Sequence, residues 1–534
     1  MAGPMRGLFL LIAAFAGVYP VDAQSPDWAW ARQTVSGDQP LNNFLSTAMD
    51  AEGNTLVTGY FGGTMALLGT VFTTSSVNDV DVVVAKFAPD GALLWARQGG
   101  AASTGEWDMG KRVACDDQGN VYVVGSHGPP PVVFEGVELS TSASGSFLVK
   151  YDPDGALVYA SEVNDGSIAG CLTVDSLGIV DVVGVLDGDL FWKRFDQTGI
   201  ATDVWTLPGS WPNRDVRFAR TTDGGMAIAV MSYVDLDADP GPDTVLVQPH
   251  WSGNGVLLKY DTLGAFVSSA IAYGIHGAMI NDLEPIADGG LMICGEVHPP
   301  ATLGGMPLAD GFIARLDALL GVEWVGALVE EDTAQGTGMP LIPFFVDGDT
   351  AGGIYVAGRV ILPSVPGFSA YIIAGEPVPE EPSIFVAKLD TTGGVAWVTL
   401  PTSPAFMAPN FGFGAGGVDV VSLCGVMSDT AVFGSHTLST SNPLESFVAR
   451  LGESSIGLAE PPPQTIRMFP NPCDRYLILA SDLENISIVD VAGRSVHVDS
   501  AKAIIDTGPL SPGLYILTGR SHGKGVQGRF MVCH

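Results

Sequence analysis

The stretch VACDDQGNVYVVGSHG, residues 113–128, decides the fold together with SFLVKYDPDGALVYA, residues 146–160. Apolar residues alternate in four short runs, and Asp, Gly and Pro interrupt these runs at residues 116–120 and 152–155. Alternation of this kind predicts β-strands, and the interrupting residues favour tight turns. Residues 113–160 are therefore predicted to form one unit of four short strands.

Versions of this unit recur along most of the chain. The third strand of each copy ends in a basic residue and then an aromatic residue or Leu, usually followed by Asp. This ending occurs as VAKF at 84–87, VKYD at 149–152, KRFD at 193–196, LKYD at 258–261, ARLD at 314–317, AKLD at 387–390 and ARL at 449–451. A Gly follows the second strand in every unit except the fourth, which has Val230 there. Seven four-stranded units predict an all-β, seven-bladed β-propeller, because a ring leaves only short strand edges.

The seventh unit ends at Leu451 without a fourth strand. At the other end of the chain, WAWARQ at residues 28–33 matches LWARQ at residues 94–98 of the first unit. We therefore predict that the N-terminal strand completes the last blade and closes the ring. Gly contributes 68 of the 534 residues and charged residues only 15%, which also favours turns and strands over long helices.

The repeats are long, and their extra length is concentrated in one place. Residues 24–458 give about 62 residues per unit, against roughly 40 to 50 in common propeller repeats. The excess lies between the second and third strands, for example at residues 233–255 and 360–383. We expect these connections to be variable loops and to carry any ligand-binding site.

The ends of the chain differ from the repeats. Residues 1–23 combine Arg6, an apolar run and small residues up to Ala23, as in a secretory signal peptide, and no later apolar run is long enough to span a membrane as a helix. AEPPPQ at residues 459–464 predicts a stiff Pro-rich linker. The predicted domains are thus the signal peptide, a propeller over 24–458 and a small β-sandwich over 465–534.

Charge separates the two predicted domains and excludes some partners. The formal net charge is −34; residues 465–534 carry 7 basic and 6 acidic residues, a net of +1, which leaves −35 for the rest. Such acidity opposes binding to nucleic acid or to anionic membranes, which requires many Lys and Arg side chains. We expect a monomeric protein with an extracellular ligand.

Two parts of the chain resemble known families. The pattern GN-x-YV-x-G at residues 119–125, followed by F-x-VK-x-D-x-x-G at 147–155, resembles the SBBP-type propeller repeat of secreted bacterial proteins. This resemblance covers roughly residues 28–451 and implies a fold without implying a ligand.

The C-terminal motifs resemble the sorting domain of type IX secretion substrates. They are MFPNPC at 468–473, ISIVDVAGRSV at 486–496, IDTGPLSPGLY at 505–515 and GRFMV at 528–532. The resemblance implies that residues 465–534 engage the type IX secretion machinery and direct the chain from the periplasm to the cell surface or the medium. The chain ends in Cys533 and His534, whereas members of this family more often end in Lys or an apolar residue. This difference concerns the last step of processing and not the assignment.

The sharpest candidate for a metal site is the loop VDLDADPGPDT at residues 234–244. Its alternate carboxylates are the hard oxygen ligands that Ca²⁺ takes, and the candidate ligands are Asp235, Asp237, Asp239 and Asp243. The loop is not an EF-hand, since Pro240 replaces the required Gly and Leu246 replaces the bidentate Glu. The alternative interpretation is a solvated acidic loop tip.

Other motifs have structural explanations. GFGAGG at residues 412–417 matches the dinucleotide fingerprint, but the residues that follow indicate strands where that fingerprint requires a helix. His127 and His298 both precede Pro-Pro pairs, which favours a loop role. Cys473 and Cys533 lie near the two ends of the small domain and could form a disulfide, whereas the other cysteines are expected to be buried thiols.

Two functions from different classes remain open at this point. The first is a non-catalytic surface or secreted propeller that binds a glycan or protein. The second is a secreted hydrolase or lyase that acts on polysaccharide through acidic residues at the channel mouth. No nucleophile or carboxylate pair has a distinguishing sequence context, so we favour the first and predict no catalytic residue.

Overall fold

The computed structural model of the chain divides into two compact units, Met1–Glu453 and Ser454–His534. It describes residues 25–37, 41–76, 78–101, 107–166, 168–209, 216–249, 253–326, 341–360, 372–373, 376–377, 384–390, 392–402, 411–452, 464–465, 468–469, 473, 475–490, 495–521 and 524–533. The predicted signal peptide and all of the predicted linker except Gln464 lie outside these residues. All regular structure in this part of the chain is β-strand, and it holds no helix long and apolar enough to cross a membrane.

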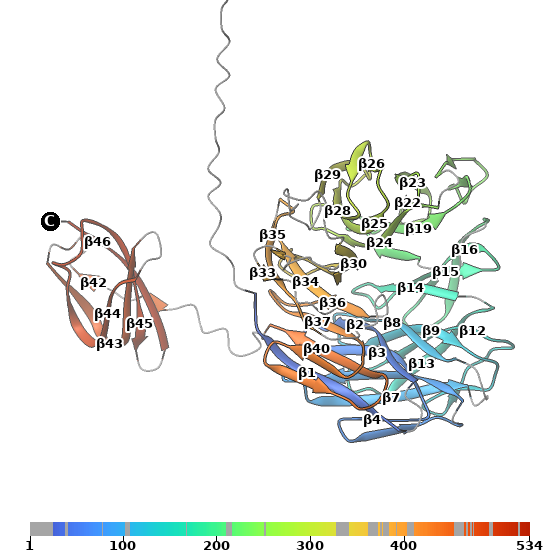
Figure 1. The fold of residues 1–534 in the computed structure, drawn as a ribbon, viewed down its shortest axis with the longest axis horizontal. Coiled ribbons are helices and arrows are strands. Elements are labelled where there is room, and N and C mark those ends of the chain that lie inside the picture. The colour runs from blue at the N-terminus through green and yellow to red at the C-terminus, as the bar shows by residue number, and fades with distance from the viewer. Residues whose placement is uncertain are drawn as a thin grey trace, which may run out of the picture. The chain divides into compact units, whose positions relative to one another are not determined.

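The first unit is a seven-bladed β-propeller, as predicted (Figure 1). Each blade is an antiparallel sheet whose four main strands follow one another from the inner to the outer edge. Blade 1 consists of β2 (Leu41–Met49), β3 (Thr55–Gly62), β6 (Val80–Phe87) and β7 (Leu93–Ala101). Blade 2 consists of β8 (Met109–Cys115), β9 (Val121–His127), β12 (Gly145–Tyr151) and β13 (Leu157–Asp165). Blade 3 consists of β14 (Ile168–Val174), β15 (Val180–Leu186), β16 (Asp189–Phe195) and β17 (Ala201–Leu207).

The remaining blades follow the same order along the chain. Blades 4 and 5 are β18 (Arg217–Arg220), β19 (Met226–Ser232), β22 (Asn254–Tyr260), β23 (Phe266–Gly274); and β24 (Ala278–Pro285), β25 (Leu291–Val297), β28 (Gly311–Leu316), β29 (Val322–Gly326). Blades 6 and 7 are β30 (Leu341–Gly348), β31 (Ile354–Val360), β34 (Ile384–Leu389), β35 (Val395–Thr399); and β36 (Gly412–Ala415), β37 (Val421–Met427), β40 (Glu445–Leu451), β1 (Trp28–Ser36).

The N-terminal strand closes the ring. Strand β1 pairs antiparallel with β40 from Trp28 opposite Leu451 to Gln33 opposite Phe447, which confirms the predicted closure. The Trp30 indole N–H donates a 2.9 Å hydrogen bond to the Pro89 carbonyl of blade 1. Trp95 repeats this contact between blades 1 and 2. The same hydrogen bond from a Trp indole to a Pro carbonyl therefore joins blades 1 and 2, and also joins blade 7 to blade 1 where the ring closes.

The repeated Gly after the second strand is required by a bulge in the inner strand. The inner-strand register shifts by one residue in blades 1, 2, 3, 5 and 6. A Cβ on Gly125 would lie 2.0 Å from the Met109 carbonyl oxygen and 2.6 Å from the Phe147 ring. The ladders β18–β19 in blade 4 and β36–β37 in blade 7 have no such shift. Blade 7 keeps Gly425, whose Cβ would lie 2.9 Å from the Phe411 Cβ atom, whereas blade 4, which lacks the bulge, has Val230.

Where the structure describes them, the long connections between second and third strands contain short hairpins, although we expected loops; most of residues 360–383 lies outside the described residues. Six of these connections contain hairpins: β4–β5 (Thr64–Leu67, Thr70–Thr73), β10–β11 (Val132–Phe134, Val137–Glu138), β20–β21 (Leu236–Asp237, Leu246–Val247), β26–β27 (Ala301–Leu303, Met306–Leu308), β32–β33 (Ile372–Ile373, Glu376–Pro377) and β38–β39 (Thr430–Phe433, His436–Ser439). Strands β4, β10 and β26 pair with β1, β7 and β23, the outer strands of the preceding blades. These hairpins thereby cover edges that would otherwise expose unpaired backbone groups.

The Asp and basic residues of the repeat are structural, as expected. In the turn between β2 and β3, the Asp50 Oδ1 atom accepts the backbone N–H groups of Glu52 and Asn54 at 3.0 and 2.8 Å. Lys86, at the end of β6, lies 2.9 Å from Asp50 and donates to the Pro153 carbonyl of blade 2. The recurring charges therefore stabilise turns and contacts between blades.

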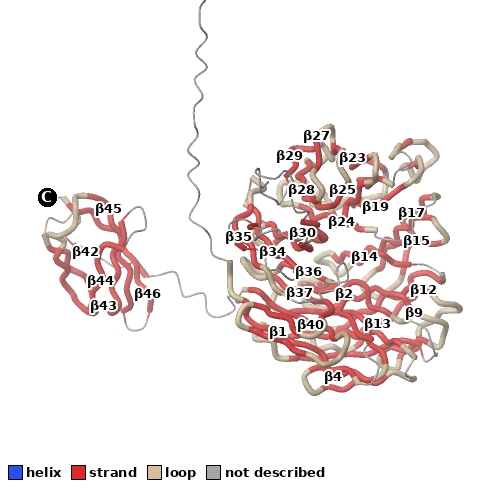
Figure 2. Tube along the Cα trace, viewed as in Figure 1, coloured by secondary structure: helices blue, strands red, loops and turns tan. Residues whose placement is uncertain are grey.

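The second unit is also all-β. Its strands are β41 (Gln464–Thr465), β42 (Met468–Phe469), β43 (Tyr476–Asp490), β44 (Ser495–Asp506), β45 (Gly513–Ser521) and β46 (Lys524–Val532), shown in red in Figure 2. Strand β43 pairs with β42, β44 and β45. Cys473 and Cys533 are free thiols: Cys473 is buried and directed at Thr507, whereas Cys533 is exposed, so the disulfide considered from sequence is not formed.

Candidate functional site

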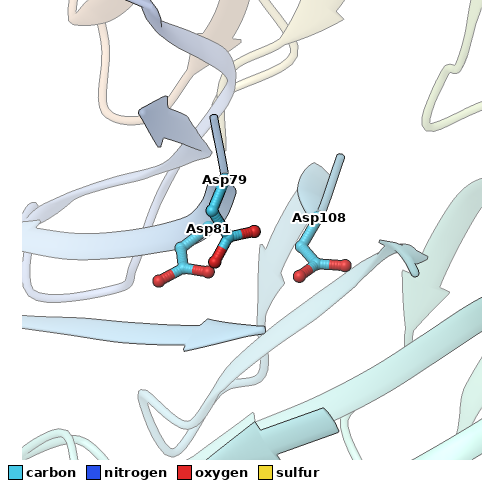
Figure 3. A group of neighbouring side chains, drawn as sticks. All are labelled: Asp79, Asp81 and Asp108. Atoms are coloured by element: carbon cyan, nitrogen blue, oxygen red, sulfur yellow. The ribbon is translucent and has the colours of Figure 1, made fainter. Parts of the chain in front are cut away.

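Three buried carboxylates converge where blade 1 meets blade 2 (Figure 3). Asp79 precedes β6, Asp81 is the second residue of that strand, and Asp108 precedes β8. The starts of the two strands are joined by a 2.9 Å hydrogen bond from the Asp108 N–H to the Val80 carbonyl. As a result, one oxygen atom from each carboxylate lies within 4.8 Å of the others, and the residues are at most 7% exposed.

Asp108 is held by backbone groups of both blades. It accepts N–H groups from Ala101, at the end of β7, and from Gly128, after β9, the latter at 2.6 Å. Gly100 lies against the same carboxylates: a Cβ there would lie 2.6 Å from Asp108 Oδ2 and 2.8 Å from Asp81 Oδ1. Only a residue without a side chain allows the chain to pass so close.

In other blades, the residue equivalent to Asp81 forms a hydrogen bond that joins the third strand to the fourth strand. Its counterparts at the start of the third strand accept a backbone N–H near the end of the fourth strand: Asp189 from Gly209, Asn254 from Gly274 and Glu445 from Ser36, at 3.0, 2.8 and 2.7 Å. In blade 1, Asp108 accepts that N–H group instead. Asp81 accepts a hydrogen bond from the Gln98 side chain and has no such role in blade closure.

Burial and neighbouring negative charge favour the protonated forms of Asp81 and Asp108. Desolvation raises the pKa of Asp81 to about 7, with further increases from the charges of Asp79 and Asp108. Desolvation likewise raises the pKa of Asp108 to about 6, although its backbone hydrogen bonds oppose the shift. Three carboxylates at this spacing are also suited to hold a divalent cation such as Ca²⁺.

Substituting Asp81→Asn should make stability less dependent on pH. The folded-state pKa of about 7 exceeds the ordinary value of 3.8, so the proton bound by Asp81 stabilises the fold fully below about pH 4, and this contribution is lost as the pH rises to about 7. The variant should equal the wild type near pH 4 and exceed it at pH 8 by roughly 1–4 kcal/mol in urea unfolding. If calcium instead stabilised the wild type at pH 8 and not the variant, the cluster would be a cation site.

His127 lies beside this cluster in a fixed orientation. Its Nδ1 is 2.7 Å from the Gly128 carbonyl, which can only accept, so Nδ1 carries a proton. Its Nε2 is 3.0 Å from Glu162 Oε2, so His127 donates a hydrogen bond to this carboxylate when it is protonated. Burial opposes protonation of His127, but the hydrogen bond and charge of Glu162 raise its pKa overall. His298, its counterpart in blade 5, is exposed.

A cavity of about 560 Å³, lined by both polar and apolar side chains, opens beside Asp81. It lies between the hairpins β4–β5 and β10–β11 and the outer strand β7. Its walls include Asp81, Gln98, the hydroxyl-bearing residues 73–75, and Arg97, whose Nε is 3.7 Å from Glu135. The cavity therefore offers both hydrogen-bond donors and acceptors around one buried carboxylate.

The acidic loop predicted to bind calcium forms the tip of the β20–β21 hairpin in blade 4. Asp237 accepts the N–H groups of Asp239 and Val245 at 3.2 and 2.8 Å, Asp239 accepts that of Gly241 at 2.7 Å, and Asp235 accepts the Gln248 amide at 3.0 Å. Asp243 is exposed. Within the described residues, Asp79, Asp81 and Asp108 form the group whose oxygens meet within 4.8 Å, and calcium binding at the loop stays a prediction.

The inner strands of the seven blades face the axis of the ring (Figure 1). On β30, Asp347 accepts N–H groups from Gly348 and from Ala415 of blade 7, at 2.8 and 2.7 Å. Desolvation raises the pKa of Asp347 to about 7 and, together with the charge of Asp347, raises that of Glu284 on β24. The sequence motifs did not single out this carboxylate pair.

The Gly-rich motif at residues 412–417 serves close packing. Residues 412–415 form the inner strand β36, so there is no helix N-terminus for a phosphate. A Cβ on Gly412 would lie 2.7 Å from the Ser46 Cα atom, and one on Gly414 would lie 2.9 Å from the Thr47 carbonyl. These glycines therefore let blade 7 approach the inner strand of blade 1.

Comparisons with known proteins concern the C-terminal unit and the fold. No curated protein matches the chain. Similar solved structures include a catalytically inactive virginiamycin B lyase from Staphylococcus aureus with quinupristin (7% identity, 78% of this chain, 98% of that chain, TM-score 0.40). Another is a protein of unknown function from Dyadobacter fermentans (10% identity, 80% and 99%, TM-score 0.37). At this similarity they carry no functional argument.

The C-terminal unit has a clear family assignment. Residues 467–533 match the family model described as a secretion system C-terminal sorting domain. The four C-terminal motifs fall at or between successive strands of this unit, from β42 to β46. The chain therefore carries a C-terminal sorting domain of type IX secretion and is exported to the cell surface or beyond it.

Proposed function

We propose that this exported propeller is a non-catalytic binding module for a hydroxyl-rich ligand, namely a glycan, held in the cavity beside Asp81. The observation that carries the proposal is the chemistry of the cavity wall, where carboxylate, amide, guanidinium and hydroxyl groups converge. Sugar hydroxyls donate and accept hydrogen bonds, so a wall that does both suits them. We also propose that the seven repeats are of the SBBP type, on the basis of the motifs at residues 119–125 and 147–155.

A glycan array with the purified propeller tests this proposal, followed by calorimetry on the best ligand. At pH 8, where Asp81 is mostly ionised, we expect Asp81→Asn to weaken binding at least about tenfold, because it removes the charge from a buried acceptor at the cavity. The matched control is Asp235→Asn, a carboxylate on the exposed hairpin of blade 4. The proposal fails if no neutral glycan binds, or if both variants bind as the wild type does.

A second candidate function is a polysaccharide hydrolase or lyase, and the pair Glu284 and Asp347 favours it. Two neighbouring carboxylates with raised pKa values could divide the roles of proton donor and acceptor. A screen for polysaccharide breakdown, with Glu284→Gln and Asp347→Asn as paired variants, separates the two functions. Product release by the wild type that both variants abolish would replace the non-catalytic proposal.

A further inference from the structure

Trp107 is exposed, unlike the other tryptophans that the structure describes. Its side chain is 48% exposed, whereas six others are at most 9% exposed: Trp28, Trp30, Trp95, Trp192, Trp205 and Trp397. Each of these six belongs to a buried apolar cluster of the propeller, and the half-buried Trp324 packs against another. Among the described residues, Trp107 is outside all of these clusters. Core packing therefore does not account for a Trp at this position.

The backbone of Trp107 is held in place at the junction of blades 1 and 2. It forms a β-bridge with Val80 at the start of β6. The next residue, Asp108, donates its N–H group to the Val80 carbonyl at 2.9 Å, and its carboxylate accepts N–H groups from Ala101 and Gly128. An exposed ring on a fixed backbone loses less conformational freedom when a ligand binds, which favours affinity.

Tyr60 places a second aromatic ring beside Trp107. The two ring centroids are 5.7 Å apart, with an angle of 57° between the ring planes. Tyr60 lies near the end of β3, where it pairs with Asn43 of β2 and Val82 of β6, and its hydroxyl is hydrogen-bonded to the Asn43 side chain. Tyr60 is half-buried, so the sheet of blade 1 supports the exposed Trp107 from below. We call these two rings the aromatic platform.

The aromatic platform adjoins the cavity beside Asp81. Val80, the partner of Trp107, precedes Asp81, so the Trp107 and Asp81 Cα atoms lie within about 9 Å of each other, from the spacing of consecutive residues and of paired strands. Asp108 lies against Gly100 of the cavity wall, whereas Trp107, the residue before it, faces the other ring of the platform. A ligand longer than one sugar can therefore contact both the cavity and the platform.

The charges beside the platform disfavour an acidic ligand. Asp108 follows Trp107 in the chain, and Asp79 and Asp81 flank its partner Val80. When ionised, these carboxylates repel an anion, whereas they can accept hydrogen bonds from the hydroxyls of a neutral sugar. One face of a sugar ring carries weakly positive C–H groups, and the face of an aromatic ring is negative, so the two can stack.

We propose that Tyr60 and Trp107 form a second subsite, which stacks one ring of a neutral oligosaccharide while a neighbouring sugar occupies the cavity beside Asp81. This inference rests on the proposed glycan binding and specifies its ligand more closely. The ligand has at least two sugars, carries no acidic group at the platform, and presents the C–H face of one ring to Trp107. Aromatic side chains of this kind often contribute a large share of binding energy.

Calorimetry on the full chain at pH 8 tests the length and charge of the ligand. The probes are linear oligomers of glucose, of mannose and of galactose, the three monosaccharides, and a sulfated oligomer. We expect one neutral oligomer to bind, its monosaccharide to bind at least about tenfold more weakly, and the sulfated oligomer to bind more weakly than the neutral one. Equal affinity for the oligomer and its monosaccharide, or tighter binding of the sulfated oligomer, would overturn the inference.

Variants of Trp107 assign the second subsite. Trp107→Ala should weaken binding of the neutral oligomer at least about tenfold and leave that of the monosaccharide unchanged. Trp107→Phe keeps an aromatic face and should bind within about threefold of the wild type. The matched control is Tyr233→Ala, an aromatic residue of blade 4 that is 50% exposed and should have no effect. Melting temperatures should change little, because both side chains are largely exposed.

Tryptophan fluorescence gives a second readout. Binding of the oligomer should shift the emission of the wild type, and this shift should be absent in Trp107→Phe even though that variant still binds. If no neutral glycan binds the wild type, the proposed function fails and the platform with it. If the oligomer binds and Asp81→Asn weakens it while Trp107→Ala does not, the proposed function stands and the platform alone is refuted.

Discussion

Deleting residues 26–34 is expected to lower the melting temperature of the propeller by more than about 10 °C. The deletion removes most of β1, the outer strand of blade 7, and with it the buried Trp28 and Trp30. Loss of one buried Trp typically costs about 3–5 kcal/mol. The deletion also exposes the edge of β40 and breaks the contact of Trp30 with blade 1.

The melting temperatures of the intact and shortened chains should be compared by thermal unfolding, with circular dichroism as the signal. The control is a rearranged chain in which residues 25–37 follow Gly452 through a short turn, since Gly452 N–H already bonds to the Asp27 carbonyl at 2.9 Å. That chain should recover most of the lost stability. An unchanged melting temperature after the deletion would mean that β1 does not close the ring.

Replacing Gly125 by Ala is expected to destabilise the propeller by about 3 kcal/mol or more. The added methyl group would meet the Met109 carbonyl oxygen at 2.0 Å, and backbone cannot move aside as a flexible side chain does. The same methyl group would also lie 2.6 Å from the Phe147 ring. The bulge of the inner strand would have to be removed or shifted to admit the new atom.

Urea unfolding measures the effect, with Gly417→Ala as the matched control. Gly417 is exposed, and a Cβ there would approach Val420 no closer than 3.8 Å, so its substitution should change stability by less than about 1 kcal/mol. Adding Phe147→Leu to Gly125→Ala should not restore stability, because the carbonyl contact persists. Full recovery in that double variant would show that ring packing, rather than the bulge, requires the Gly.

The sequence predicted the parts of the fold that repeat. Strand alternation, Asp turns and the WARQ match indicated seven blades and the closing strand, because these features depend on local chemistry that recurs in each blade. The repeated Gly was visible as a pattern, yet its cause was not. Gly125 is required by a bulge in a different strand, and a bulge depends on register between strands rather than on neighbouring residues.

The candidate sites were the least predictable part. Asp79 and Asp81 are two among many acidic residues at strand ends, and Asp108 lies far from both in the chain. Only the pairing of Val80 with Trp107 at the blade junction brings them together. The run from Asp235 to Asp243 is conspicuous because its carboxylates are close in sequence, whereas in the structure several of them accept hydrogen bonds within their own hairpin.

The closing strand also has a consequence for the order of folding. The hydrogen bond from Thr34 to Glu445 joins residues 411 positions apart, so the ring cannot be completed before the last blade has been synthesised. Closing so long a loop carries an entropic cost that earlier blades do not meet. Blades 1 to 6 can form from strands that are close in sequence, whereas β1 stays unpaired until β40 has been synthesised. Ring closure is therefore expected to be a late and distinct kinetic step.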